Sequence, residues 1–259
     1  MSLERKKVFG FDFISARRVE DIAATIVGES MRSQTPEVLI TPNAHQTGVL
    51  LSKEYPRFRP FFSRSRYVLP DGMPLVWLSK LKGQALQSRL TGSDLFPVFW
   101  AEVKQQQAPV TMILPSEEIA ARFRAEYPLC SCIVPRFFSA DDEVYIRQLA
   151  DLVADSISAH ASRFVFIGLG IPKQELLTVA VHDEMERRSM RVGVLFLLLG
   201  ASFEFYFGTK KRAPGIYQRT GLEWLYRFAQ EPRRLWKRYT VDNFRFVMLA
   251  LKEWIKPAK

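Results

Sequence analysis

Cysteine is nearly absent from this chain of 259 residues, which contains only Cys130 and Cys132. The single residue between them is shorter than the usual spacing of zinc ligands, and in a strand both side chains would point to the same face. We therefore expect two reduced thiols in the core of a cytosolic protein.

Long hydrophobic runs are also absent. The longest apolar stretch, residues 192–203, is far shorter than the ~20 residues that a helix needs to span a bilayer. The N-terminal segment is charged, and its apolar run is interrupted by Asp12, unlike a secretory signal. The sequence therefore predicts a cytoplasmic protein without a transmembrane helix.

The motifs of several enzyme classes are missing. The three histidines, His45, His160 and His182, are scattered, and no HExxH or CxxC spacing accompanies them, so we expect no metal centre. There is no GxSxG elbow, no Walker loop and no three-glycine dinucleotide fingerprint. No Asp-x-Asp pair is present to hold a divalent ion. We expect no cofactor, and we expect arginines and helix dipoles to neutralise any bound diphosphate.

The composition is that of an ordinary globular protein, with 47% hydrophobic and 25% charged residues, but the net charge of +10 is unevenly distributed. Residues 205–259 hold thirteen Lys and Arg against four Asp and Glu, together with three of the five tryptophans. We therefore divide the chain into a core, residues 1–204, and a basic, aromatic C-terminal appendage, residues 205–259. Such an excess of positive charge predicts an anionic partner.

The core alternates short apolar runs with amphipathic segments, which predicts an α/β fold with a Rossmann-like, largely parallel sheet flanked by helices. The expected strands are residues 7–13, 37–41, 66–69, 110–114, 130–134, 164–168 and 192–198. The expected helices are residues 18–32, 44–54, 73–80, 93–106, 116–126, 141–160 and 172–188, with Ser93 and Ser116 as N-caps and Pro172 in a first turn.

Ligands of open α/β sheets bind beyond the carboxyl ends of the strands, so the loops that follow the strands are the candidate site. Three of these loops, residues 41–43, 70–72 and 168–175, are polar and contain Gly or Pro. In the last, Gly168 and Gly170 would let backbone approach a ligand, and the following helix N-terminus would attract a phosphate. A simple tight turn explains the same glycines equally well.

Two further residues have both a structural and a functional interpretation. Asp71 fits an Asp-Gly turn, or a carboxylate that accepts a proton from an attacking hydroxyl group. Arg89 fits a solvated arginine, or a bidentate phosphate ligand in a loop with Gly92 and Asp94.

Together these loops resemble one family, the WecG/TagA/CpsF glycosyltransferases of bacterial cell-surface polysaccharide synthesis. The resemblance extends from about residue 5 to 247, and the C-terminal piece is the most specific. Five pieces match in order: TPNAHQ (41–46), PDGMPLVW (70–77), SRLTGSDLF (88–96), FIGLGIPKQE (166–175) and KRAPGIYQRTGLEWLYRFAQEPRRLWKRY (211–239). After the last strand the chain departs from the family, with Glu204 where Asp is common.

The resemblance implies an inverting, metal-independent transferase that moves a sugar from a UDP-sugar to a polyprenyl-diphosphate-linked saccharide in exopolysaccharide, teichoic-acid or surface-antigen synthesis. It places Asp71 at the position of the catalytic base. It also implies a substrate-binding set that we complete with the loop residues above: Thr41, Asn43, Arg89, Gly168, Gly170, Gln174, Glu175, Arg212, Arg219 and Arg227. The appendage would close over the site and bring the last three arginines in. The sugar, the acceptor glycan and the oligomeric state, a homo-oligomer included, stay open.

The appendage also predicts a location for the protein. From Pro232 onward, apolar and aromatic residues recur at helical spacing on one face, and basic residues recur on another. Such a helix fits an anionic surface at the inner face of the cytoplasmic membrane, or a helix packed on its own domain with a solvated basic face.

A second function fits the same basic and aromatic C-terminus, that of a non-enzymatic nucleic-acid-binding protein. The nearly neutral core and the lack of RNP, KH and zinc motifs argue against it. We therefore expect no nucleic-acid partner.

Overall fold

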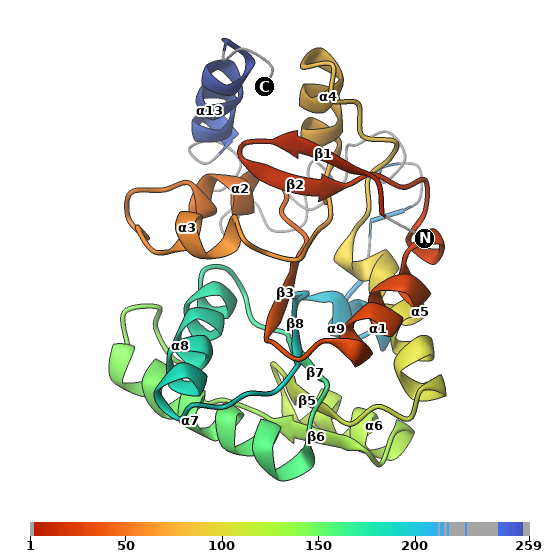
Figure 1. Cartoon of the computed structure of the whole chain (residues 1–259), viewed down its shortest axis with the longest axis vertical. Coiled ribbons are helices and arrows are strands. Elements are labelled where there is room, and N and C mark those ends of the chain that lie inside the picture. Colours follow the sequence, from red (N-terminus) through yellow and green to blue (C-terminus); the bar gives the residue numbers. More distant parts are fainter. Residues whose placement is uncertain (1–2, 212, 215–216, 218–225, 227–242, 256–259) are drawn as a thin grey trace.

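The computed structural model describes residues 3–211, 213–214, 217, 226 and 243–255. Within these residues an eight-stranded sheet runs in the order β1-β2-β4-β3-β8-β7-β5-β6, parallel throughout except for the β1–β2 pair (Figure 1). The strands are β1 (Arg5–Val8), β2 (Phe11–Ile14), β3 (Glu37–Ile40), β4 (Tyr67–Val68), β5 (Val110–Ile113), β6 (Cys130–Ile133), β7 (Phe164–Ile167) and β8 (Leu195–Leu198). The predicted α/β class with a largely parallel sheet is confirmed.

Helices cover both faces of the sheet. They are α1 (Ala23–Arg32), α2 (Ala44–Leu50), α3 (Phe58–Phe62), α4 (Met73–Leu81), α5 (Gly92–Gln105), α6 (Glu117–Glu126), α7 (Glu143–His160), α8 (Lys173–Arg187), α9 (Ser202–Tyr206) and α13 (Asn243–Ile255), with a 3₁₀ turn at Val19–Asp21. Among the described residues, no helix is long and apolar enough to cross a membrane.

Alternation along the strands divides the buried side chains into two cores. On β7, Val165 and Ile167 face the core formed with α2, α3, α4, α7, α8 and α13. Phe164 and Phe166 face the other core, formed with α1, α5, α6 and α9. Because successive side chains of a strand point to opposite faces, a fully apolar strand such as β7 must be covered on both sides.

The N-terminal apolar run differs from the prediction, which gave a single strand over residues 7–13. It forms an antiparallel hairpin instead, with Phe9 and Gly10 at the turn. Both turn residues have positive φ, 56° and 83°, as a two-residue hairpin loop of type I′ requires. The N–H of Phe9 donates to Glu253 Oε1 (3.0 Å), and its ring lies 5.8 Å from that of Phe246, so α13 holds this turn.

Several helix boundaries also correct the prediction. The side chain of Thr91, not that of Ser93, caps α5, because it accepts a hydrogen bond from the N–H of Asp94. Pro172 precedes α8 as its N-cap residue. Ser116 caps α6 as expected. The short helices α3 and α9 were not predicted, since runs of five residues carry little periodicity.

The two cysteines lie on the edge strand β6 as free thiols. Their sulfur atoms are 3.4 Å apart, so both side chains are on one face of the strand, as expected. Cys130 is buried and Cys132 is half-buried.

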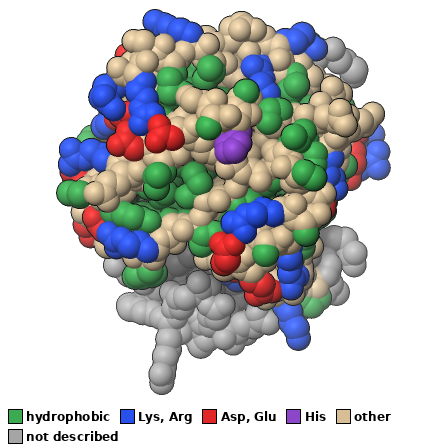
Figure 2. Space-filling model, turned by 90° about the horizontal axis from the view of Figure 1, so that it is seen from below, with side chains coloured by type: hydrophobic (Ala, Val, Ile, Leu, Met, Phe, Trp, Pro, Cys, Tyr) green, Lys and Arg blue, Asp and Glu red, His purple; other side chains and the backbone are tan. Residues whose placement is uncertain are grey.

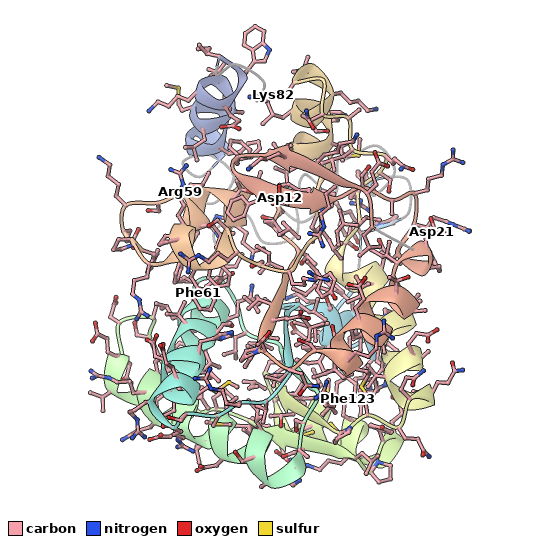
Figure 3. All side chains as sticks on the ribbon, viewed as in Figure 1. Asp12, Asp21, Arg59, Phe61, Lys82 and Phe123 are labelled. Carbon is pink, nitrogen blue, oxygen red and sulfur yellow. The ribbon has the colours of Figure 1, made fainter. Side chains whose placement is uncertain are left out.

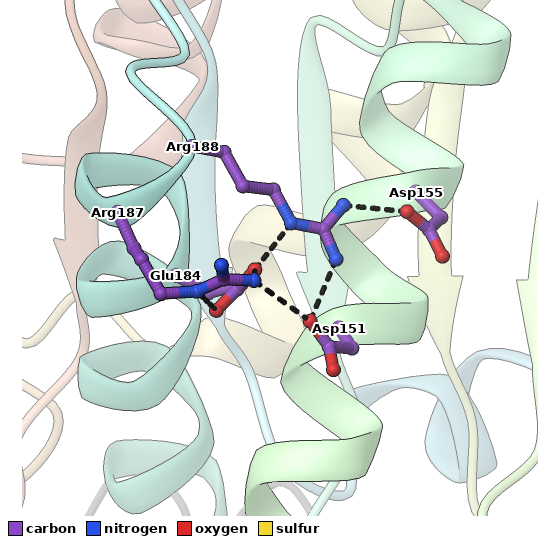
Figure 4. A network of polar contacts seen from close by, with 5 residues as sticks. All are labelled: Asp151, Asp155, Glu184, Arg187 and Arg188. Atoms are coloured by element: carbon purple, nitrogen blue, oxygen red, sulfur yellow. Dashed lines mark hydrogen bonds and ion pairs between the residues drawn. The ribbon is translucent and has the colours of Figure 1, made fainter.

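A network of charged side chains joins α7 to α8 at the C-terminal end of α8 (Figure 4). Arg188 contacts Asp151 (2.6 Å), Asp155 (2.5 Å) and Glu184. Arg187 also contacts Glu184. Hydrogen bonds from Arg187 and Arg188 lower the pKa of Glu184 to about 2.

We expect Arg188→Gln to lower the thermal midpoint by a few degrees at pH 7, because one guanidinium serves three carboxylates. The folded pKa of Glu184 lies below its ordinary value of 4.5, so this contribution is complete above pH 4.5 and is lost as the pH falls toward 2. The difference in melting midpoint between wild type and variant should therefore be smaller at pH 3 than at pH 7.

Arg147→Gln is the matched control for this prediction. Arg147 is exposed and contacts one carboxylate, that of Glu143 (3.5 Å), and it also donates to the carbonyl of Glu143 (3.3 Å), so its loss should have a smaller effect at every pH. A gap between wild type and Arg188→Gln that does not narrow at low pH would contradict the assignment to Glu184.

Candidate active site

The predicted loops meet at one edge of the sheet. Strands β4, β3, β8 and β7 are neighbours and run parallel, so their carboxyl ends lie side by side. The segments that follow them are residues 69–72, 41–43, 199–202 and 168–172 respectively. The sequence therefore predicted correctly that Thr41, Asn43, Asp71 and the glycine loop share an edge, the usual ligand-binding edge of such sheets.

Backbone hydrogen bonds fix the loop that carries Asp71. The N–H of Asp71 donates to the carbonyl of Pro42 (3.1 Å), and the N–H of Leu90 donates to the carbonyl of Pro70 (2.8 Å). Asp71, Asn43 and Arg89 are all half-buried. The loop of Asp71 thus lies between the segment of Thr41 and Asn43 and the segment of Arg89.

Gly72 lets the chain turn immediately after Asp71. Its φ of 143° lies in the region that favours glycine, and a Cβ there would lie 3.8 Å from the Cβ of Asn43. The turn interpretation of Asp71 is therefore correct as local structure. It is compatible with the functional interpretation, because the same turn holds the aspartate at the carboxyl edge.

Hydroxyl groups gather where α5 begins. A Cβ on Gly92 would lie 3.2 Å from both Thr41 Oγ1 and Ser202 Oγ, so these three residues touch. Ser93 Oγ is 3.4 Å from Ser202 Oγ. Ser93 and Ser202 were not predicted as site residues. The segment after β8 was the available signal, since it too follows a strand at this edge.

The two glycines of the loop after β7 have different environments. Gly168 is buried, and a Cβ there would lie 2.6 Å from a ring carbon of Phe203, so the sheet and α9 require glycine. Gly170 is exposed, and a Cβ there would meet nothing within 4 Å. Of these two glycines, Gly170 is the one with open space for a ligand beside it.

Gln174 and Glu175 lie in the first turn of α8 and are buried, with exposed fractions of 3% and 0%. Glu175 Oε1 accepts hydrogen bonds from Gln46 Nε2 (2.6 Å) and Gln174 Nε2 (2.9 Å). Burial raises the pKa of Glu175 to about 7, and these hydrogen bonds oppose the rise. Gln46, in the first turn of α2, is a further residue that the loops alone did not indicate.

The remaining predictions concern the C-terminal arginines, Glu204 and the expected lack of a metal centre. Arg212, Arg219 and Arg227 lie outside the described residues, so their placement over a diphosphate stays a prediction. Glu204 is half-buried in α9, with Lys210 Nζ 3.8 Å from its carboxylate. No group of three or more His, Cys, Asp or Glu side chains with metal-binding geometry occurs in the part of the chain that the structure describes.

Comparison with known proteins agrees with this geometry. A sequence profile described as the glycosyl transferase WecG/TagA/CpsF family matches residues 6–259. The chain belongs to this glycosyltransferase family. It is similar to the N-acetylglucosaminyldiphosphoundecaprenol N-acetyl-beta-D-mannosaminyltransferase of Bacillus spizizenii, with 32% identity over 187 residues, which are 71% of this chain and 67% of that protein.

For this glycosyltransferase, alanine substitutions of the two loop glycines test which glycine is required by packing and which is not. Gly168→Ala should destabilise the protein by about 1–3 kcal/mol, because the new methyl group overlaps the ring of Phe203. Gly170→Ala should change the free energy of unfolding by less than about 0.5 kcal/mol. Urea unfolding of both variants measures the difference. Equal effects would contradict the packing described here.

Proposed function

We propose that the protein is an inverting glycosyltransferase that moves a sugar from a UDP-sugar to a polyprenyl-diphosphate-linked sugar, with Asp71 as general base. The observation that carries the proposal is the place of Asp71. In a chain of this family, it lies at the carboxyl edge of the sheet, between the segments of Asn43 and Arg89. Asp71 is half-buried at this edge, and a carboxylate is a group that can accept a proton from a substrate hydroxyl group.

In the proposed reaction, Asp71 accepts the proton of the acceptor hydroxyl group as its oxygen attacks the anomeric carbon. The bond from that carbon to the diphosphate breaks, and UDP takes its electron pair. UDP departs from the face opposite to the attack, which inverts the configuration at the anomeric carbon. Thr41 and Ser93, whose hydroxyl groups lie near the start of α5, would donate hydrogen bonds to phosphate oxygens. Arg89 would add positive charge.

The name of the B. spizizenii relative guides the choice of substrates. That protein transfers an N-acetylmannosaminyl group to a diphosphoundecaprenol-linked N-acetylglucosamine. UDP-N-acetylmannosamine and a lipid-linked N-acetylglucosamine are therefore the first pair to test with this chain. Independence from metal, inferred from the lack of an Asp-x-Asp pair, stays a prediction.

Asp71→Asn should reduce the rate of transfer by 10²–10⁴-fold, because an amide cannot accept the proton. Binding of UDP should be retained, since the phosphate donors are other groups. The rate is measured as UDP release with the lipid-linked acceptor, and binding is measured by calorimetry. Wild-type turnover in Asp71→Asn would leave Asp71 as a turn residue only.

The same preparation distinguishes the enzyme from the nucleic-acid-binding alternative. A transferase binds UDP and is indifferent to generic DNA and RNA. A basic binder shows the opposite, with affinity that falls steeply as salt increases.

We also propose that the protein acts at a membrane surface, and the contact between α13 and α4 supports this. Lys82 lies between the two helices (Figure 3), and its Nζ donates to the carbonyl of Glu253 (2.6 Å). The residues next to this contact are large, apolar and exposed. Leu81 is 69% exposed, Trp254 is 56% exposed and Ile255 is 78% exposed. We call these three residues the apolar end.

The neighbouring surface has the same character. Trp77, one turn before Leu81 on α4, is 51% exposed, and Val247, Met248 and Leu251 are exposed on α13. Lys80, which precedes Leu81 in the sequence, and Lys252, two residues before Trp254, are also exposed. Apolar residues, tryptophan and lysine together suit the headgroup region of an anionic bilayer. The opposite end of the molecule mixes basic, acidic and hydrophobic side chains (Figure 2).

Helix α4 belongs to the core segment, whereas the sequence assigned membrane contact to residues 205–259 alone. Leu81→Glu should therefore weaken binding to phosphatidylglycerol liposomes about tenfold or more, because one buried leucine contributes about 1.5–3 kcal/mol. Cosedimentation of the full chain at fixed salt measures the change.

Leu152→Glu is the matched control, since Leu152 is 55% exposed on α7, away from α4. It should bind liposomes like the wild type. Equal binding by Leu81→Glu would remove α4 from the membrane contact. A shift from dimer to monomer in Leu81→Glu, without a change in liposome binding, would assign the surface to a second copy of the chain.

A further inference from the structure

A buried hydrogen-bond chain connects the first turns of α2 and α8. Asn43 Oδ1 accepts from the N–H of Gln46 (3.0 Å), and Gln46 Nε2 donates to Glu175 Oε1 (2.6 Å). Gln174 Nε2 donates to the same oxygen (2.9 Å). Gln46, Gln174 and Glu175 are each at most 3% exposed. These hydrogen bonds therefore connect two candidate site residues, Asn43 and Gln174, through two residues that are shielded from solvent, Gln46 and Glu175.

The chemistry of the acceptor fixes how the Gln174 amide is turned. Glu175 Oε1 already accepts hydrogen bonds from two amide groups, whereas a glutamine side chain donates at one end and accepts at the other. Glu175 must therefore face the Nε2 end of Gln174. The Oε1 end is left to face another group.

The free end of Gln174 faces the loop after β8. A Cβ on Gly200 would lie 3.9 Å from Gln174 Oε1, so this oxygen lies at the carboxyl edge where the site loops meet. Gln174 Oε1 is buried and has no hydrogen-bond partner among the described residues. Buried carbonyl oxygens in proteins are rarely left unpaired, so the position calls for a hydrogen-bond donor.

We propose that Glu175 is a positioning residue, which turns the Gln174 amide so that its oxygen accepts a hydrogen bond from a hydroxyl group of the sugar nucleotide. The inference rests on the proposed function. It also narrows the role of Gln174, because an amide oxygen repels a phosphate oxygen and accepts only from a donor. Glu175 acts through Gln174 and does not itself touch the ligand.

The carboxylate is suited to this role because both of its known partners are donors. An apolar residue in its place would leave the Nε2 groups of Gln46 and Gln174 without an acceptor. Gln174 would then be free to present either end to the ligand. A glutamine at position 175 would still offer an oxygen to both amides, so it should rescue the orientation in part.

The test uses the full chain, calorimetric binding of UDP-N-acetylmannosamine, and analogues that lack one hydroxyl group on the ribose or on the sugar. Wild type should bind one of these analogues at least tenfold more weakly than the parent compound. The Gln174→Met and Glu175→Leu variants should bind the parent compound about tenfold more weakly than the wild type does. They should bind that same analogue as tightly as the wild type does. Glu175→Gln should keep most of the preference.

The analogue that the wild type binds more weakly than the parent compound, and that the variants do not, identifies the hydroxyl group, either on the ribose or on the transferred sugar. Glu37→Leu is the matched control, since Glu37 is a half-buried glutamate at the opposite end of β3 with an oxygen that has no partner among the described residues. It should leave the preference for the parent compound unchanged, whatever its effect on stability.

Different results would contradict the proposed function and the positioning role of Glu175. A wild-type protein that does not bind UDP contradicts the proposed function. Normal binding of UDP-N-acetylmannosamine, with the same hydroxyl preference in wild type, Glu175→Leu and Gln174→Met, overturns the positioning role alone. A Glu175→Leu variant that only melts at a lower temperature likewise reduces Glu175 to a structural residue.

Discussion

The pairing of β3 with β8 joins the two halves of the candidate site, the loops that follow β3 and β4 and the loops that follow β8 and β7. These central strands pair in register from Glu37 with Leu195 to Ile40 with Leu198, although about 158 residues separate them along the chain. The pairing sets the segment of Thr41 beside the turn at Gly200, and it sets α2 beside α8. The hydrogen bond of Gln46 to Glu175, which joins α2 to α8, depends on this register.

The site is polar, but the supports beneath it differ in kind. Around Asp71 the backbone itself provides the support, through the hydrogen bonds of residues 70, 71 and 90. Around Gln174 the support is a buried carboxylate. A buried charge is costly unless donors surround it, and the raised pKa of Glu175 reflects that cost. Retaining a carboxylate there is easier to explain by orientation than by stability.

The general form of the site follows from the sequence, because parallel strands and their carboxyl-end loops obey simple rules. Asp71, Thr41 and the glycine loop were placed correctly on that basis. Contacts between distant segments were not predictable. The hydrogen bond of Gln46 to Glu175 joins residues 129 positions apart, and it depends on the strand order. The hairpin turn was missed because a positive φ at Phe9 has no sequence signature, although Gly10 offered a hint.

Helix α4 connects the two proposals, the reaction and the membrane contact. It starts just after Asp71 and Gly72 and ends at Leu81, so its nine residues extend about 13 Å at 1.5 Å per residue. Headgroups occupy roughly 5–8 Å on each side of a bilayer. If α4 is perpendicular to the bilayer and Leu81 lies in that layer, Asp71 lies just beyond the headgroups. A sugar held above the surface by a diphosphate would present its hydroxyl group at about that height, so a short helix suffices to bring the base to a lipid-linked acceptor.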